Sequence, residues 1–419
     1  MKFITGLAVF ACALAIYPGN NTISWIPTSD IKTGWELWSI GDFNGAEKIA
    51  DEVLETIPAS QDALRLKIDL LYVRGKYDDA LHLFTKMNDT YDDYGKVRSL
   101  MGEALLHLGK PGEAFDMFNG YDSVKAVVTK EMSLKPFSVT GDKTYVIPFL
   151  DSVQLADNMP AINAELNGSP ITLRMDTGGT YIVMGPDDAE KLGIQKGTVT
   201  EGVHATTKTS VWNSTAEKLE LPGGLIFNNV PVRIVESLKG FIIMGTNILE
   251  QFLCTIDYPN SRYILTPRSR KDLYDDHLAM LKEDRVTMPF YLWGDHYMIC
   301  KGSYNNFDNL NYFMDSGLIA FGMNKNGEME QAGLNVSKET LLKWGYGENE
   351  LKETFMFNND NKVSLGGLTE DNVIIYFDSK LDKDRVFGGI NIDALLSHGF
   401  LHKYSWTIDF DNFRYIFTK

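Results

Sequence analysis

Two short segments of the chain each place an aspartate between an apolar run and a glycine. The first is LRMDTGGTYIVMG, residues 173–185, and the second is YFMDSGLIAFGM, residues 312–323. A lone carboxylate in apolar surroundings is costly in free energy unless it has a partner or a use. Two carboxylates about 3 Å apart cannot both ionise, so they share one proton, and one can act as a base while the other acts as an acid. We therefore take Asp176 and Asp315 as the candidate catalytic pair.

The matched surroundings of the two aspartates indicate an internal duplication. Asp176 and Asp315 are 139 residues apart, and four further pairs of segments follow in the same order, up to an offset of 152 residues at the end. A duplicated unit that gained a few loop residues would show such a growing offset. The further pairs are Gly193 with Gly333, Gly223 with Gly366, Gly245 with Gly388, and TIDYPNSRYILT from Thr255 with TIDFDNFRYIFT from Thr407.

From about residue 135 onward, short β-branched or aromatic runs alternate with Gly, Asn and Asp turns. Examples are TYVIPFL, LIFNNVPVRIV and FLCTIDY. This texture is typical of an all-β domain. We expect a first lobe at residues 135–270 and a second lobe at residues 283–419, each supplying one aspartate.

The segment before these lobes has a different pattern, typical of paired helices. LWSIGDFNGA, LYVRGKYDDA and LLHLGKPGEA repeat with a period of 34 residues, which places Gly41, Gly75 and Gly109 in equivalent turns. This spacing resembles tetratricopeptide repeats, whose stacked helix pairs bury a continuous apolar face. We expect these repeats at residues 24–133, where they would bind a protein partner or present a substrate. An ordinary helical bundle is the alternative.

The D-T/S-G triplets, the apolar pairs before a later glycine and the TID…RYI strands together resemble the aspartic proteases. The two halves, which extend from about Val139 to Lys419, look most similar to retropepsin-like domains, fused in tandem as in the two-lobed pepsin-like enzymes. The resemblance implies that Thr177 and Ser316 hydrogen-bond across to the opposite loop. Gly178 and Gly317 would let the backbone turn sharply beside the carboxylates. The apolar pairs Ile243–Met244 and Val386–Phe387 would pack under the two loops.

The predicted fold class is thus α + β and multidomain: helical repeats, then an all-β, two-lobed, acid-protease-like domain made by duplication. The predicted function is an aspartic endopeptidase that cleaves a polypeptide substrate with a water activated between Asp176 and Asp315. A catalytically degenerate fold that binds a peptide or another ligand is the alternative, and a swapped dimer is a third interpretation. The flaps over the cleft are expected near residues 197–215 and 345–362, with Trp212 and Tyr346 as candidate tips.

Other classes of function find little support in the sequence. The net charge is -16, and basic clusters with interleaved aromatic residues are lacking, which argues against nucleic-acid binding. His398 and His402 lack the glutamate of a zinc protease and are expected at the surface, and we expect no metal and no cofactor. Cys254 and Cys300 lie in strand-like runs and are expected to be buried free thiols.

The first twenty residues have the composition of an export signal. Lys2 precedes an apolar run from Phe3 to Ile16, which is short for a membrane span and typical of a secretory signal. Cleavage after ALA, lipid attachment at Cys12 within VFAC, and retention as an uncleaved anchor are the three alternatives. We expect the protein to be exported, to the periplasm or cell envelope or to the medium, with membrane attachment only through this segment.

Overall fold

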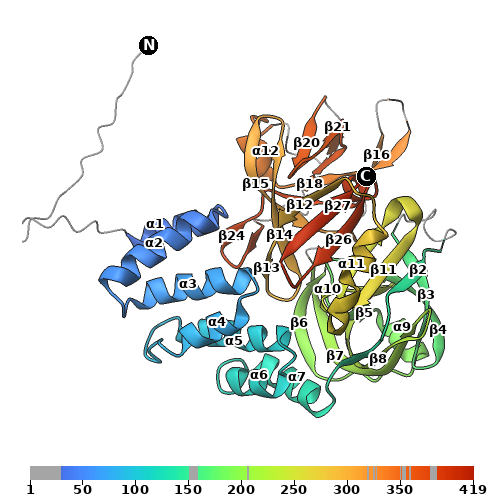
Figure 1. Ribbon diagram of the computed structural model, residues 1–419, viewed down its shortest axis with the longest axis horizontal. Helices are drawn as coiled ribbons and strands as arrows, with labels where there is room; N and C mark the ends of the chain where they lie inside the picture. Colours follow the sequence, from blue (N-terminus) through green and yellow to red (C-terminus); the bar gives the residue numbers. More distant parts are fainter. Residues whose placement is uncertain are drawn as a thin grey trace, which may run out of the picture.

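The computed structural model describes residues 30–150, 159–204, 207–318, 320–323, 326, 328–349, 351, 355–357, 360–377 and 385–419. A block of helices comes first and lies beside a larger region of β-strands (Figure 1). The predicted signal segment at residues 1–20, with Cys12, lies outside the described residues, as do residues 24–29 of the predicted repeats. Within the described part of the chain, no helix has both the length and the apolarity needed to span a membrane.

The helical block is a series of antiparallel helices in which each packs on the next. Its predicted turn glycines, Gly41, Gly75 and Gly109, all adopt a left-handed φ of 70–72° just after a helix, a conformation that glycine accepts without a Cβ clash. The resemblance to tetratricopeptide repeats stays a prediction. The helices are α1 (Ile31–Ser39), α2 (Phe43–Thr56), α3 (Gln61–Val73), α4 (Tyr77–Phe84), α5 (Tyr94–His107), α6 (Pro111–Phe118) and α7 (Ser123–Leu134).

The first lobe is built on a sheet with the strand order β1-β8-β5-β9-β4-β3-β7-β6, in which β7 also pairs with β8. Alternate residues of β8 are buried, as expected for a sheet that covers a core. Two short helices, α9 (Pro186–Lys191) and α10 (Thr246–Leu249), follow β5 and β9. The strands are β1 (Ser138–Thr140), β3 (Ala161–Leu166), β4 (Ser169–Met175), β5 (Ile182–Met184), β6 (Val199–His204), β7 (Thr207–Leu221), β8 (Leu225–Val235) and β9 (Ile242–Met244).

The second lobe has a sheet with the order β19-β22-β18-β25-β15-β14-β20-β21, and β13 pairs with β14. Its strands are β13 (Tyr291–Trp293), β14 (Tyr297–Tyr304), β15 (Phe307–Met314), β18 (Leu334–Val336), β19 (Phe355–Phe357), β20 (Lys362–Leu365), β21 (Leu368–Asp371), β22 (Ile375–Phe377) and β25 (Ala394–Leu396). Two small hairpins and two short helices complete it. They are β16 (Phe321–Met323) with β17 (Met329–Gln331), β23 (Val386–Phe387) with β24 (Ile390–Asn391), α12 (Lys338–Lys343) and α13 (His398–Leu401).

A third sheet joins the two lobes, with the order β12-β27-β26-β10-β11-β2. Its strands are β2 (Tyr145–Pro148), β10 (Phe252–Asp257), β11 (Arg262–Pro267), β12 (Arg285–Pro289), β26 (Ser405–Asp409) and β27 (Arg414–Thr418); η1 (Tyr258–Asn260), η2 (Arg268–Leu273) and α11 (Tyr274–Ala279) connect parts of it. At its centre Thr255 of β10 pairs with Thr407 of β26, and their Oγ1 atoms are 2.6 Å apart. Equivalent residues of the two halves therefore meet on a local two-fold axis, and the predicted fold class, helices followed by a two-lobed β domain, is confirmed.

Two details of the predicted duplication are wrong. β5 and α9 at residues 182–191 correspond to β18 and α12 at residues 334–343, so the offset there is already 152. The counterpart of Gly193 is consequently Gly345, which follows α12 with a φ of 93°, and not Gly333. The physical reason is the β16–β17 hairpin, which lies between Asp315 and β18 and has no counterpart between Asp176 and β5. At Gly223 and Gly366 the offset is 143, so it falls again and does not simply grow along the chain.

The helical block is docked mainly on the second lobe. One buried cluster unites Trp38, Phe43 and other helical residues with Ile299, Phe313 and Ile390. The Trp38 indole Nε1 donates a hydrogen bond of 2.9 Å to the Gly388 carbonyl. The buried apolar contacts of this shared core stabilise the helical block in its position on the second lobe.

The prediction for the two cysteines is confirmed, and the prediction for His398 is wrong. Cys254 and Cys300 are buried and free, as expected. His398 is not at the surface: it is only 5% exposed, begins α13 and packs edge-on against Tyr258. His398 is buried because α13 follows β25 directly and lies in the interior, below the second aspartate loop.

Candidate active site

Each candidate aspartate follows a strand that lies parallel to a second, apolar strand. Asp176 follows β4, which pairs with β9, and its N–H donates a hydrogen bond of 3.0 Å to the Met244 carbonyl. Asp315 follows β15, which pairs with β25, and its N–H donates one of 2.9 Å to the Leu396 carbonyl. Both carboxylates are thus fixed by the same backbone arrangement, once in each lobe.

The structure corrects the second of the predicted apolar pairs. Leu395–Leu396, before Ser397, occupies the place that the sequence analysis gave to Val386–Phe387, before Gly388. Leu396 lies 152 residues after Met244, the same offset as between the two TID strands. Val386 and Phe387 instead form β23, and Phe387 stacks on Tyr297 at a ring distance of 4.1 Å. The sequence pattern calls for a glycine after the apolar pair, but the second lobe has Ser397 at that position, so the pair was assigned to the wrong residues.

Reciprocal hydrogen bonds join the two aspartate loops. The Thr177 N–H donates to Ser316 Oγ at 3.0 Å, and the Ser316 N–H donates to Thr177 Oγ1 at 3.0 Å. The Thr177 hydroxyl in turn donates to the Met314 carbonyl at 2.8 Å. Both side chains are buried, so these bonds are protected from competing water and hold the lobes in register.

The loop glycines lie against the aspartate of the opposite lobe. A Cβ added to Gly178 would be 2.6 Å from Asp315 Oδ1, and one added to Gly317 would be 2.2 Å from Asp176 Cγ. Their N–H groups also donate to the carboxylate of their own loop, at 2.7 Å from Gly178 to Asp176 and 3.1 Å from Gly317 to Asp315. The structure therefore brings all six predicted site residues together at the contact between the lobes.

Burial changes the protonation of the carboxylate pair. Removal from water raises the pKa of both carboxyl groups, since a buried charge is disfavoured. The negative charge of Asp176 raises the pKa of Asp315 further, whereas hydrogen bonds and the nearby His296 ring act to lower the pKa of Asp176. The two groups therefore titrate as a pair, and the negative charge of Asp176 favours the shared proton on Asp315.

A cavity of about 940 Å³ reaches this pair from the side of Asp176. Asp176, Gly178 and Gly179 line one end of it; Asp315 does not line it but lies behind, against Gly178. Other walls come from three parts of the molecule: helices α5 to α7, first-lobe elements that include β5 to β9 and α10, and the second-lobe turn between β13 and β14. The helical block is therefore part of the enclosure of the site.

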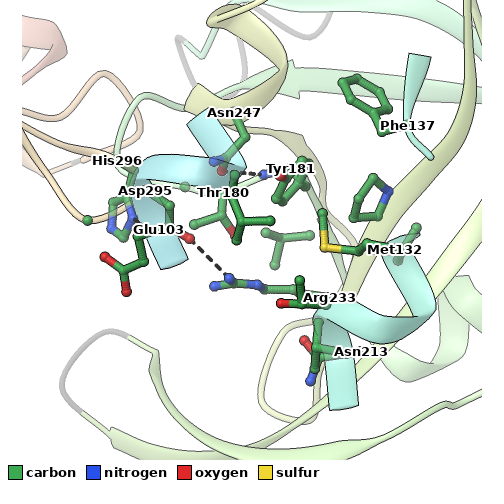
Figure 2. Close-up of a pocket in the computed structure, with 18 of the residues that line it drawn as sticks. Glu103, Met132, Phe137, Thr180, Tyr181, Asn213, Arg233, Asn247, Asp295 and His296 are labelled. Atoms are coloured by element: carbon green, nitrogen blue, oxygen red, sulfur yellow. Dashed lines mark hydrogen bonds and ion pairs between the residues drawn. The ribbon is translucent and has the colours of Figure 1, made fainter. Parts of the chain in front are cut away.

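A chain of charged side chains crosses from one lobe to the other inside this cavity. Arg233 of β8 lies 3.0 Å from Asp295, and Asp295 is 2.6 Å from the Nδ1 of His296 (Figure 2). Burial acts to raise the pKa of Asp295, but Arg233 and His296 outweigh it and hold that pKa well below its usual range. The sequence analysis missed all three residues, because no local pattern marks residues that meet only across the lobe contact.

A second ionic contact ties the helical block to both lobes. His107 at the end of α5 lies 2.9 Å from Glu250 of the first lobe through Nδ1, and its Nε2 is 3.0 Å from the Gly294 carbonyl of the second. Burial acts to lower the pKa of His107, but the Glu250 carboxylate and the Gly294 carbonyl raise it to about 9. The charged imidazole donates from both nitrogens at a junction of three parts of the chain.

The predicted flap tips are not at hairpin tips. Trp212 lies inside β7, opposite Val199 of β6, with the Lys196 ammonium 3.9 Å from the centre of its ring. The β6–β7 hairpin does line the cavity, through Thr200, Glu201 and Thr209, and residues 205–206 between its strands lie outside the described residues. Tyr346 follows α12 and packs on the core, and residues 350, 352–354 and 358–359 of the second predicted flap (345–362) also lie outside the described part.

Three comparisons relate the chain to known proteins. Residues 162–251 match a family model described as "gag-polyprotein putative aspartyl protease". The chain resembles the aspartic proteases. A solved retropepsin-like aspartic protease from Rickettsia conorii shares 24% identity over 31% of this chain and 92% of its own, with a TM-score of 0.23. An aspartic proteinase from Irpex lacteus shares 10% identity over 66% of this chain and 97% of its own, with a TM-score of 0.42. No curated protein matches the chain.

The family match covers Asp176 and the strands around it but ends before the second lobe. The match supports a resemblance of this segment to aspartic proteases. In the described residues no group of three or more His, Cys, Asp or Glu side chains is arranged to hold a metal ion.

Proposed function

We propose that the protein is an aspartic endopeptidase in which Asp176 and Asp315 activate one water molecule. The observation that carries this proposal is the pair of crossed contacts: each loop glycine lies against the other lobe's aspartate, and Thr177 and Ser316 bond reciprocally. Such contacts place the two carboxyl groups side by side from separate lobes. A structural role alone would not require two buried carboxylates in contact, because their desolvation and mutual repulsion cost free energy.

The reaction follows from the unequal protonation of the pair. The ionised Asp176 takes a proton from water, and the water oxygen attacks the carbonyl carbon of the scissile peptide bond. The protonated Asp315 gives its proton to the carbonyl oxygen, so that a neutral tetrahedral intermediate forms. Its collapse breaks the C–N bond as Asp176 gives the proton it took from water to the leaving nitrogen, and one hydroxyl of the intermediate returns its proton to Asp315 as the new carboxyl C=O forms, which restores the starting state of the pair. The N–H groups of Gly178 and Gly317 hold the carboxylates in place throughout.

The test is hydrolysis of an unfolded protein substrate between pH 3 and pH 8. Asp176→Asn and Asp315→Asn should each lower the rate at least about 100-fold, since each removes one half of the acid–base pair. A statine-containing peptide such as pepstatin should inhibit the unaltered enzyme. Asp272→Asn, which changes an exposed carboxylate that pairs with Arg270 and does not line the cavity, is the control and should keep the activity. A rate that survives either change at Asp176 or Asp315 would overturn the proposal.

We further propose that the protein is exported through its N-terminal segment. The support is the short apolar run from Phe3 to Ile16 after Lys2. Cell fractionation with the mass of the purified protein distinguishes the three forms of processing: cleavage after Ala15, lipid attachment at Cys12, and an uncleaved anchor. Cys12→Ser would release the protein from the membrane fraction only if Cys12 carries the lipid. A cytoplasmic, full-length protein would contradict export.

A further inference from the structure

Helix α7 presents a row of apolar side chains to the cavity. Val124, Val128 and Met132 are spaced four residues apart, which places them on one side of the helix, and all three line the cavity. Ala126 is buried on the side that packs within the block, whereas the buried Thr129 lines the cavity beside Val128. Val124 is 48% exposed, and Val128 and Met132 are half-buried, so the row is only partly covered by the rest of the described chain.

The opposite wall is a small apolar cluster of the first lobe. Val211, Val235 and Leu238 are buried together with the partly buried Val183 and Ile243, apart from the main core. These residues line the same cavity as the α7 row. An apolar cluster separate from the core and open to a cavity is typical of a ligand-binding wall.

The two walls meet close to the catalytic pair. Phe137, just after α7, packs edge-on against Tyr181 at a ring distance of 6.1 Å, and Tyr181 is five residues after Asp176. Figure 2 shows Met132 and Phe137 reaching toward Tyr181, with Arg233 below them. Arg233 is paired with Asp295 and is not free to bind an incoming charge. Between Met132, Phe137 and Tyr181 the slot offers apolar surface to an incoming chain.

Helix α7 is fixed at the end that faces this slot. The Asn229 Nδ2 donates to the Pro136 carbonyl at 3.1 Å, and β1, which follows, pairs with β8 through Val139 and Phe227. Thr198 Oγ1 of the first lobe donates to Glu131 of α7 at 3.4 Å. The slot is preformed in this way, and a ligand would not have to spend binding energy on ordering it.

From these observations we propose that α7 forms a substrate subsite of the protease: Val128, Met132, Phe137 and Tyr181 receive a bulky apolar side chain of an extended polypeptide near the bond to be cut. The helical block then takes part directly in the choice of substrate, in addition to any partner it binds. This inference rests on the proposed function, since the occupant follows from continuity of the slot with Asp176.

The test compares Val128→Asp with Val127→Asp. The neighbouring Val127 is 46% exposed and does not line the cavity, so the same change there is the matched control. We expect Val128→Asp to raise KM at least about tenfold for peptides with Leu, Phe or Met at the selected position, with little change in kcat, because a charge replaces apolar surface. It should also improve the cleavage of peptides with Lys at that position. Val127→Asp should match the unaltered enzyme.

A second variant guards against a folding defect at Val128. Val128→Phe keeps the slot apolar but narrows it, and should shift the preference from Phe and Leu toward Ala at the same position. Identical cleavage profiles for the unaltered enzyme and all three variants would overturn the subsite. If the unaltered enzyme cleaves nothing, the binding of a labelled apolar peptide, measured by fluorescence anisotropy, replaces hydrolysis. If the peptide binds Val128→Asp more weakly than Val127→Asp, the subsite is supported although the protease proposal fails. If the peptide binds all variants equally, the subsite is overturned as well.

Discussion

The two lobes repeat one backbone arrangement around the aspartates but differ directly beneath it. In the first lobe, β9 is followed by Gly245 and Thr246, and the Thr246 hydroxyl donates to the Thr177 carbonyl at 2.9 Å. In the second lobe, the equivalent positions after β25 are Ser397 and His398, and the ring nitrogens of His398 have no hydrogen-bond partner among the residues that the structure describes. The two loops and the shared sheet therefore fix the geometry of the aspartate pair, while the residues that follow β9 and β25 differ between the lobes.

The lobes also differ in how they use their outer surfaces. The second lobe shares a buried cluster with the helical block, through residues such as Ile299 and Ile390. The first lobe instead faces helix α7 across the cavity. One lobe thus serves as the base on which the helices are fixed, and the other as the wall of the cleft. The predictions below probe where the lobes are equivalent and where they are not.

The largest effect is expected where the lobes are equivalent, at the loop glycines. Gly317→Ala would place a Cβ 2.2 Å from Asp176 Cγ, and Gly178→Ala would place one 2.6 Å from Asp315 Oδ1. Either change must displace a catalytic carboxylate, so we expect a loss of kcat of about 100-fold or more. Gly112→Ala is the control, because a Cβ there meets nothing within 4 Å. Full activity in either loop variant would show that the carboxylates are not held as described.

A smaller but unequal effect is expected at the next pair of equivalent residues, Gly245 and Ser397. A Cβ at Gly245 would lie 2.4 Å from the backbone of Gly179 and Thr180, so Gly245→Ser should lower the free energy of unfolding by about 3 kcal/mol. Ser397→Ala only removes the hydrogen bond from Ser397 Oγ to the Ala332 carbonyl, at about 1 kcal/mol. Urea unfolding of both variants measures the difference, and equal losses would contradict it.

The third prediction uses the imidazole that replaces a threonine in the second lobe. Burial and the nearby His402 lower the pKa of His398 from 6.5 to about 3. Because His398 is neutral in the folded protein and protonated in the unfolded chain, the folded protein loses stability as the pH falls below 6.5. His398→Thr introduces the residue type of Thr246, the equivalent position in the first lobe. Between pH 6.5 and pH 4 this variant should lose less free energy of unfolding than the unaltered protein, by up to about 3 kcal/mol.

The measurement is the melting temperature of both proteins as a function of pH. Some acid sensitivity should remain in His398→Thr, because burial also lowers the pKa of His277 to about 4. Parallel curves for the two proteins from pH 6.5 to pH 4 would show that His398 is not neutral in the folded state.

The smallest effect concerns two asparagines with a left-handed backbone, one within β8 and one just after β21. Asn229 and Asn372 are equivalent and both adopt a left-handed φ, 52° and 60°. Glycine accepts this conformation, so Asn372→Gly should be nearly neutral. Asn229→Gly also loses the hydrogen bond to Pro136 and should cost about 0.5 to 1 kcal/mol more. Chemical denaturation of the two variants decides the point, and a larger loss at Asn372 would reverse it.

The parts that the sequence predicts are those encoded by short, repeated signals. The D-T-G and D-S-G triplets, the strand texture and the 34-residue period of Gly41, Gly75 and Gly109 each depend on neighbouring residues. They predict the aspartate pair, the two lobes and the helical block before them. The bonds between Thr177 and Ser316 follow from the resemblance once the two loops are identified.

The remaining features could not be predicted because they depend on distant contacts. Ser397 stands where the pattern asks for glycine, and the β16–β17 hairpin shifts the offset, so the second apolar strand was misplaced. Arg233, Asp295 and His296 meet only when the lobes close on each other. One local signal was present but not used: the four-residue spacing of Val124, Val128 and Met132 on α7.

The central claim is that the two lobes build one catalytic site, and the most direct test is the binding of a statine-containing peptide inhibitor by calorimetry. We predict one inhibitor per chain, with affinity reduced about 100-fold or more by Asp176→Asn and equally by Asp315→Asn. Two independent sites per chain, or an affinity that depends on only one of the two aspartates, would contradict the account.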